Sequence, residues 1–192
     1  HDSLGVPIRC TQNPTMGEEW RNGWHPEKII TTKNRKRVLV VGSGPAGLEA
    51  SRVLGKMGHK VALAEKSREL GGRIITEAKL PGLSEWIRVR DWRITQINKC
   101  ENIEVFPESF MTADSVLELG YEDVVIATGA RWAKDSIGRH SDCDFKKVDM
   151  KMIVSGDEVL ENPIKSKSKF VIYDDDHYYF GSVLALELKR LG

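Results

Sequence analysis

The 192-residue chain has room for one complete domain and part of a second, by the usual size of roughly 100–200 residues per domain. Its residues are 40% hydrophobic and 30% charged, as in soluble globular proteins, and 29 basic against 28 acidic side chains leave a net charge of +1. This balance excludes the strong basic field of a nucleic-acid or membrane-surface binder, and no apolar run approaches the ~20 residues that span a bilayer. We therefore expect a cytoplasmic protein without nucleic-acid or membrane partners.

Residues 1–36 are rich in Pro, Gly, Asn, Thr and Trp and have no sustained period, which predicts an irregular segment that packs onto another part of the protein. Because the sequence begins with histidine and stops just after a predicted helix, we expect a piece of a longer protein. The cysteines have the spacing of neither a disulfide framework nor a zinc site. They are Cys10, Cys100 and Cys143.

The next segment predicts a strand, a glycine-rich turn, a helix and a second strand. Residues 38–41 are a continuous apolar run of strand length, and apolar residues at helical spacing follow up to Gly58, a favourable helix end. Residues 60–64 return to strand character and end at Glu65. Together they predict a βαβ unit of the usual size, about thirty residues.

The rest of the chain continues this alternation of strands and helices. We expect a helix over 83–100 with Ser84 as its N-cap, and an apolar strand over 124–127 that runs into a turn. Two more strands and a closing helix are expected at 103–106, 170–173 and 183–191.

The turn after the first strand has the spacing G-x-G-x-x-G, and its position between a predicted strand and a predicted helix makes this short motif specific. Gly42 allows a tight turn, Gly44 lets the backbone approach a diphosphate, and Gly47 lets the helix pack closely on the strand. Pro45 suits the first helical turn, and Ala46 belongs to the same predicted cofactor-binding turn. The helix N-terminus supplies N–H groups and partial positive charge for phosphates.

Glu65 lies at the end of the second strand, 21 residues after Gly44. A carboxylate there can accept hydrogen bonds from both ribose hydroxyls, and it repels a 2′-phosphate. With the adjacent Lys66 included in the site, the sequence predicts an unphosphorylated adenosine, as in FAD, NAD or ADP. The alternative is a solvated strand end beside an ordinary glycine turn.

Two later motifs favour FAD or ADP over NAD. The tripeptides at 71–73 and 127–129 resemble, in this order, the two secondary signatures of glutathione-reductase-like flavoproteins. We therefore predict an α/β fold of the Rossmann-like, FAD/NAD(P)-binding, glutathione-reductase type. The further residues expected at the cofactor are Gly72, Arg73, Ala127, Thr128 and Gly129.

A second Rossmann-like lobe is predicted to begin near the end of the chain. Its strand-to-helix turn carries three consecutive carboxylates at 174–176, followed by bulky aromatic residues where a pyridine-nucleotide site has glycines. Carboxylates facing a diphosphate are repulsive, so we expect no NAD(P)H here and no electrons from a nicotinamide. The alternative for the acidic run is a helix cap with a solvated loop.

Several motifs resemble a segment of the trimethylamine dehydrogenase family, which includes dimethylamine and histamine dehydrogenases and amine demethylases. The resemblance covers essentially the whole chain. Its most specific stretches are Cys10-Thr11-Gln12-Asn13-Pro14, Gly23-Trp24-His25-Pro26-Glu27, Leu80-Pro81-Gly82-Leu83-Ser84-Glu85-Trp86, Ala127-Thr128-Gly129-Ala130-Arg131-Trp132 and Asp175-Asp176-His177-Tyr178-Tyr179.

The resemblance implies a larger homo-oligomeric enzyme with an N-terminal TIM barrel that carries FMN, a 4Fe-4S cluster and two Rossmann-like lobes. Cys10 matches the fourth cysteine of the cluster, and the first three would precede His1. The family mechanism would oxidise a secondary or tertiary amine at FMN and pass electrons through the cluster to an electron-transferring flavoprotein. The first lobe holds ADP in some relatives and FAD in others.

The expected domains are an irregular segment with the last cluster cysteine (1–36), an FAD- or ADP-binding Rossmann-like domain (37–139), a linker (140–168) and the truncated start of a second Rossmann-like lobe (169–192). Two other functions stay open. One is a dienoyl-CoA or enoate reductase with FAD and NADPH sites, against which the acidic turn argues. The other is a non-catalytic module in which ADP is structural.

Overall fold

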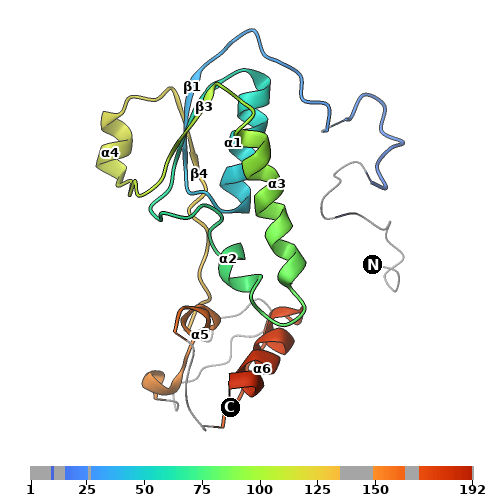
Figure 1. The fold of residues 1–192 in the computed structure, drawn as a ribbon, viewed down its shortest axis with the longest axis vertical. Helices are drawn as coiled ribbons and strands as arrows, with labels where there is room; N and C mark the ends of the chain where they lie inside the picture. The colour runs from blue at the N-terminus through green and yellow to red at the C-terminus, as the bar shows by residue number, and fades with distance from the viewer. Residues whose placement is uncertain (1–9, 11–15, 26, 135–148, 163–168, 192) are drawn as a thin grey trace.

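The computed structural model describes residues 10, 16–25, 27–134, 149–162 and 169–191 (Figure 1). At its centre is a four-stranded parallel sheet in the order β3-β2-β1-β4, which is the α/β architecture predicted from the sequence. The strands are β1 (Arg37–Val41), β2 (Lys60–Ala64), β3 (Ile103–Phe106) and β4 (Asp123–Ile126).

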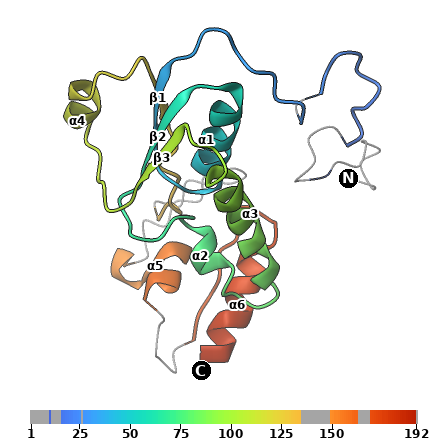
Figure 2. The same ribbon diagram turned by 45° about the horizontal axis from the view of Figure 1, so that its top comes forward.

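One face of the sheet is covered by two helices, α1 (Pro45–Met57) and α3 (Ile87–Ile97), which lie side by side (Figures 1 and 2). Helix α1 ends at Gly58 in the left-handed conformation, as its sequence position predicts. Burial on both faces explains why β1 and β2 are continuous apolar runs. The core on this face consists of Val40, Leu48, Val61, Leu63, Ile97 and Ile103.

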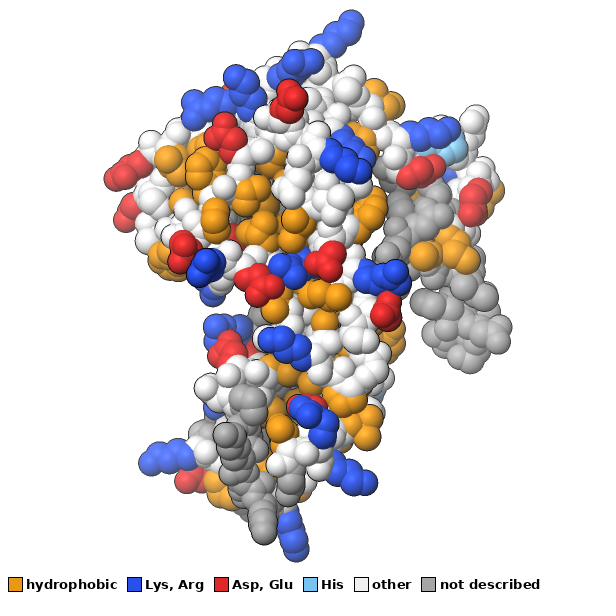
Figure 3. Space-filling view, in the orientation of Figure 1, with side chains coloured by type: hydrophobic (Ala, Val, Ile, Leu, Met, Phe, Trp, Pro, Cys, Tyr) orange, Lys and Arg blue, Asp and Glu red, His pale blue; other side chains and the backbone are white. Residues whose placement is uncertain are grey.

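The other face of the sheet is covered by one short helix and a few neighbouring residues. Helix α4 (Ala113–Glu118) begins with a capping box formed by Thr112 and Ser115, and it lies beside this face. Met111, Val116 and Tyr121 pack against the buried residues Leu39, Val41, Ala62 and Ala64. Figure 3 shows hydrophobic side chains gathered on the surface over α4 and the sheet.

The three remaining helices form a separate group below the sheet in Figure 1. They are α2 (Ile74–Glu77), α5 (Gly156–Glu161) and α6 (Phe180–Leu191). The hydrophobic core here consists of Leu80 and Leu83, which follow α2, together with Val159 of α5 and with Phe180 and Leu184 of α6. Across the described ranges, no helix is both long and apolar enough to cross a membrane.

Two predicted local features are wrong. Residues 170–173 pair with none of the four described strands, and the Val171 side chain is 97% exposed, because a strand needs a neighbour with which to share hydrogen bonds. Ser84 does not cap a helix. It is the first residue of the 3₁₀ turn η2 (Ser84–Trp86), which precedes α3.

The predicted linker contains regular structure. Residues 150–152 form a short 3₁₀ helix, η3 (Met150–Met152), and α5 follows. Helix α5 begins with a capping box in which the Ser155 hydroxyl accepts from the Glu158 N–H and the Glu158 carboxylate accepts from the Ser155 N–H. The sequence signal for this helix was the spacing S-x-x-E.

Candidate functional site

The predicted nucleotide motifs meet at the carboxyl edge of the sheet. In the strand register Val41 pairs with both Ala64 and Ile126, so the residues that follow these three strands are neighbours. The Gly42 N–H donates to the Ala64 carbonyl at 2.8 Å, and the Ala127 N–H donates to the Val41 carbonyl at 2.8 Å. The glycine-rich turn therefore lies between the end of β2 and the Ala-Thr-Gly turn.

Two of the glycines are required by close backbone packing. Gly42 has a φ of 99°, and a Cβ atom on it would overlap the carbonyl oxygen of Ala127. A Cβ atom on Gly47 would overlap the carbonyl oxygen of Gly42. The strand, the turn and α1 can approach this closely only because both side chains are absent.

Gly44 differs from these two glycines. It is the N-cap of α1 in an extended conformation, no side chain caps the helix there, and a Cβ atom on it would meet nothing within 4 Å. Helices α4 and α5, in contrast, cap their own first turns with Thr112 and Ser155. Because the first N–H groups of a helix lack intrahelical partners, the opening at Gly44 suits an anionic ligand.

The second glycine signature packs against the first. Gly72 has a φ of 59°, and a Cβ atom on it would lie 3.1 Å from the Gly44 Cα atom. Ala127 is half-buried beside Gly42, whereas Lys66, Thr128 and Gly129 are exposed. The structure thus brings the two glycine turns and the Ala-Thr-Gly turn together beside the open space at Gly44.

Glu65 is buried, with 6% of its surface exposed, and it is held by hydrogen bonds. Its Oε2 atom accepts from the Ser43 N–H at 2.8 Å and from the Ser43 hydroxyl at 2.7 Å, and its Oε1 atom accepts from the Ser67 N–H at 2.9 Å. Burial acts to raise the pKa of Glu65, but the hydrogen bonds from Ser67 and Ser43 outweigh it and lower the pKa below the ordinary value. Glu65 is therefore ionised at neutral pH.

Sequence reasoning missed Ser43 and Ser67. Their only signal was position: Ser43 lies inside the glycine motif, and Ser67 follows Glu65 by two residues. Carboxylate contacts across adjacent strands depend on register, which a motif does not contain.

The lowered pKa of Glu65 predicts a loss of stability in acid. A carboxyl group whose pKa is lower in the folded than in the unfolded chain stabilises the fold above about pH 4.3, its unfolded pKa, and this stabilisation is lost as the pH falls through the folded pKa. We expect Glu65→Gln to be less stable at pH 7 by about 1–3 kcal/mol, because an amide NH₂ group then faces N–H donors. Urea unfolding from pH 7 to pH 3 measures this. The difference between the variant and the wild type should shrink in acid, and a constant difference would contradict the role of the charge.

Arg73 follows Gly72 directly and is the N-cap residue of α2. Its guanidinium group pairs with Asp157 in α5 and lies 3.3 Å from the Glu77 carboxylate. Asp157 also accepts a hydrogen bond from the Trp132 N–H at 2.6 Å. Burial is the main cause that raises the pKa of Glu77, whose carboxylate is hydrogen-bonded to Tyr179. Arg73 thus joins the nucleotide-binding lobe to α5, a contact that sequence reasoning did not predict.

The acidic turn at 174–176 is folded onto the start of α6. One carboxylate oxygen of Asp174 accepts from the N–H groups of Asp176 and His177, both at 3.1 Å. A Cβ atom on Gly181, in the first turn of α6, would lie 2.5 Å from the other oxygen. A carboxylate of the protein itself therefore lies beside the helix start, where a phosphate would need to bind.

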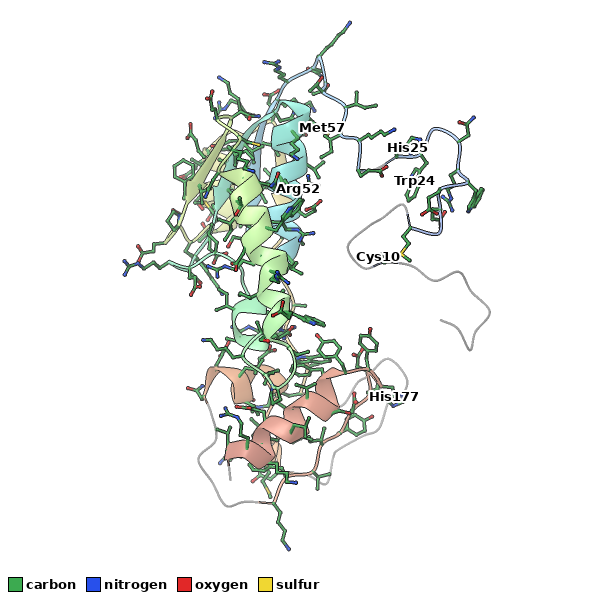
Figure 4. All side chains as sticks on the ribbon, turned by 45° about the vertical axis from the view of Figure 1, so that its right-hand side comes forward. Cys10, Trp24, His25, Arg52, Met57 and His177 are labelled. Carbon is green, nitrogen blue, oxygen red and sulfur yellow. The ribbon has the colours of Figure 1, made fainter. Side chains whose placement is uncertain are left out.

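Cys10 lies in the N-terminal segment, apart from the sheet and exposed (Figure 4). Cys100 is half-buried against the core under α1 and α3, and Cys143 lies outside the described residues. Within the part of the chain that the structure describes, no three His, Cys, Asp or Glu residues are grouped as metal ligands. A 4Fe-4S cluster takes four cysteine ligands, so these residues alone do not fit one.

Known proteins are similar to this chain along nearly its whole length. Dimethylamine dehydrogenase of Hyphomicrobium sp. (strain x) is 39% identical over 195 residues, which cover 98% of this chain and 26% of that protein. The structure of histamine dehydrogenase from Rhizobium sp. 4-9 matches with a TM-score of 0.83 and 43% identity, over 96% of this chain and 29% of that one. The structure of 6-hydroxypseudooxynicotine amine oxidase from Pseudomonas geniculata N1 matches with a TM-score of 0.88 and 39% identity, over 96% and 28%.

These relatives confirm the predicted resemblance to the trimethylamine dehydrogenase family, and this chain spans about a quarter of the length of the curated relatives it matches. The family model described as pyridine nucleotide-disulphide oxidoreductase matches residues 36–161, which include the glycine-rich turn, Glu65 and the Ala-Thr-Gly turn. This match confirms the predicted fold class and indicates an FAD-type nucleotide-binding domain. The chain belongs to the pyridine nucleotide-disulphide oxidoreductase family.

Proposed function

We propose that this chain is the adenine-nucleotide-binding and electron-transfer portion of a flavin-dependent amine dehydrogenase that demethylates secondary or tertiary amines. The main observation in support of a nucleotide site is the N-terminus of α1 at Gly44, which no side chain caps, together with the ionised Glu65 at the end of the adjacent strand. The amine dehydrogenase activity is inferred from the relatives, two of which are named as dehydrogenases of dimethylamine and histamine.

The residues at the opening fit the ADP part of FAD, or ADP itself. The N–H groups at the start of α1 would hold the diphosphate, Gly44 and Gly72 would let it approach the backbone, and Glu65 would accept from the ribose. FAD would supply the redox-active flavin, whereas ADP would be structural. In both cases the protein positions the nucleotide and repels a 2′-phosphate.

The second lobe supports an electron source other than a nicotinamide. The Asp174 carboxylate, beside the first turn of α6, would repel the diphosphate of NAD(P)H. This contact favours an amine dehydrogenase over a dienoyl-CoA or enoate reductase, which requires NADPH.

Other parts of the proposal rest on the family resemblance. FMN in a barrel domain would oxidise the amine, and Cys10 would be the fourth ligand of a 4Fe-4S cluster whose other three cysteines precede this chain. An electron-transferring flavoprotein would accept the electrons, and the complete protein would be a cytoplasmic homo-oligomer.

Thermal unfolding with added nucleotides tests the site. At a concentration 100-fold above the dissociation constant, ADP or FAD should stabilise the chain by about 2.7 kcal/mol, which corresponds to a rise in Tm of roughly 5–10 °C. NADPH and adenosine 2′,5′-bisphosphate should give no shift, because Glu65 and Asp174 repel their phosphates. If neither ADP nor FAD raises Tm while NADPH does, the assignment is wrong.

A further inference from the structure

Asp157 contacts the chain just after two of the turns beside the opening at Gly44. One of its carboxylate oxygens pairs with the guanidinium group of Arg73, the residue after Gly72, and the other accepts from the Trp132 N–H at 2.6 Å. Trp132 comes shortly after the Ala-Thr-Gly turn. Helix α5, which carries Asp157, lies beside α2 in both ribbon views (Figures 1 and 2). A single carboxylate therefore connects the second glycine turn to the Ala-Thr-Gly turn.

Arg73 is held on several sides. Its Nε atom lies 3.3 Å from the Glu77 carboxylate, and its guanidinium group lies 5.8 Å from the centroid of the Trp132 ring. A guanidinium group at this distance is attracted to the face of an aromatic ring. The side chains of Glu77 and Asp157 are only 11% and 12% exposed. Arg73 thus lies between two largely buried carboxylates and an aromatic ring.

Arg73 can act on a bound nucleotide in two ways. It can turn toward the diphosphate at the opening, or it can stay with Asp157 and act through the backbone of Gly72. Among the residues that the structure describes, no other Lys or Arg pairs with Glu77 or Asp157, so the first way leaves both carboxylates without a cation. The loss of one partner from a buried ion pair is strongly destabilising. The geometry therefore favours the second way.

The backbone carries the effect of this ion pair to the nucleotide site. A Cβ atom on Gly72 would lie 3.1 Å from the Gly44 Cα atom, so the second glycine turn lies directly against the N-cap of α1. Because Arg73 follows Gly72, a fixed guanidinium group limits the movement of that turn. The hydrogen bond from the Trp132 N–H to Asp157 limits the Ala-Thr-Gly turn in the same way.

We propose that Asp157 is a positioning residue that holds both turns beside the nucleotide, so that the docking of α5 and the binding of a nucleoside diphosphate favour each other. The inference rests on the proposed nucleotide site and adds its regulation: a movement that separates α5 from Arg73 weakens nucleotide binding. Such coupling is reciprocal, so a bound nucleotide holds α5 more tightly by the same factor.

Calorimetric titration of the full 192-residue chain with ADP distinguishes the two ways in which Arg73 can act. Asp157→Asn keeps the size of the side chain and removes the charge that holds the guanidinium group. It should bind ADP about tenfold more weakly than the wild type, which is a typical size for coupling between two sites. If Arg73 binds the diphosphate instead, the variant releases it and ADP binds more tightly. Tighter or unchanged binding would overturn the inference.

Glu158→Gln is the matched control for this variant. Glu158 is the next residue on α5 and pairs with Lys134, so the change removes one negative charge from the same helical turn without touching Arg73 or Trp132. Glutamine also keeps the capping box with Ser155. The control should bind ADP within about twofold of the wild type, because salt screens an exposed charge. An equal loss in both variants would mean that Asp157 has no particular role.

Hydrogen exchange of the wild-type chain measures the reciprocal effect, and it does not depend on whether Asp157→Asn folds. At saturating ADP the amides of α5 should exchange about tenfold more slowly, whereas those of α4, beside the other face of the sheet, serve as the reference. Slower exchange confined to residues 42–47 and 71–73 would overturn the inference and leave the nucleotide site intact. If the wild type binds no ADP, the proposed function itself fails and the inference falls with it.

Discussion

Gly44→Asp is expected to weaken adenine-nucleotide binding by at least about 100-fold while the free energy of unfolding changes by less than about 1 kcal/mol. The structure has open space for the new side chain, and aspartate is a favourable N-cap that the helix dipole of α1 stabilises. The same carboxylate would occupy the N–H groups that a diphosphate needs and would repel its charge. Titration with ADP and urea unfolding measure the two effects separately.

The control for this variant is Gly44→Ala, which adds a methyl group without a charge. It should fold, with a cost of about 1 kcal/mol because alanine is a poor N-cap, and it should lose less affinity than the aspartate variant. ADP binding to Gly44→Asp within threefold of the wild type would rule out the N-terminus of α1 as the diphosphate site.

Gly47→Ala is expected to destabilise the chain by about 3 kcal/mol or more, a large part of the 5–15 kcal/mol of a typical domain. The added Cβ atom would overlap the carbonyl oxygen of Gly42, and that turn cannot move freely. The Gly42 N–H donates to the Ala64 carbonyl, and the backbone of Ala127 lies so close that even a Cβ atom on Gly42 would overlap it. Urea unfolding at neutral pH measures the loss.

The same substitution at two glycines three residues apart separates folding from binding. At Gly44 a methyl group enters open space, and at Gly47 it enters an occupied contact. An unfolding free energy for Gly47→Ala within 1 kcal/mol of the wild type would mean that α1 can shift away from β1. The close packing inferred for this motif would then be incorrect.

The link through Arg73 shows how the nucleotide lobe and the helices below it are joined. Gly72 packs against Gly44, and Arg73 pairs with Asp157. The Asp157 carboxylate also accepts a hydrogen bond from the Trp132 N–H. Trp132 in turn stacks on Phe180 with ring centroids 5.1 Å apart. The turn beside the nucleotide opening is therefore continuous with the contact to α5 and α6.

Sequence alone predicted the four strands, the course of α1 and the order of the nucleotide motifs. These features depend on local rules: apolar runs of strand length, helical spacing, and glycine where the backbone needs a positive φ or a close approach. Helix α1 could be followed to Gly58 for this reason. The resemblance to amine dehydrogenases was equally visible in short, specific motifs.

Tertiary structure decided the partners of the charged and polar side chains. Glu65 was expected to bind the ribose hydroxyls, and its contact with Ser43, which the register of β1 and β2 creates, was not predicted. Arg73 was expected at the cofactor, and it pairs with Asp157, 84 residues later. The run at 170–173 has strand-forming residues without a described neighbour to pair with. In each case the outcome depends on atoms far away in the chain, and spacing along the sequence carries no information about them.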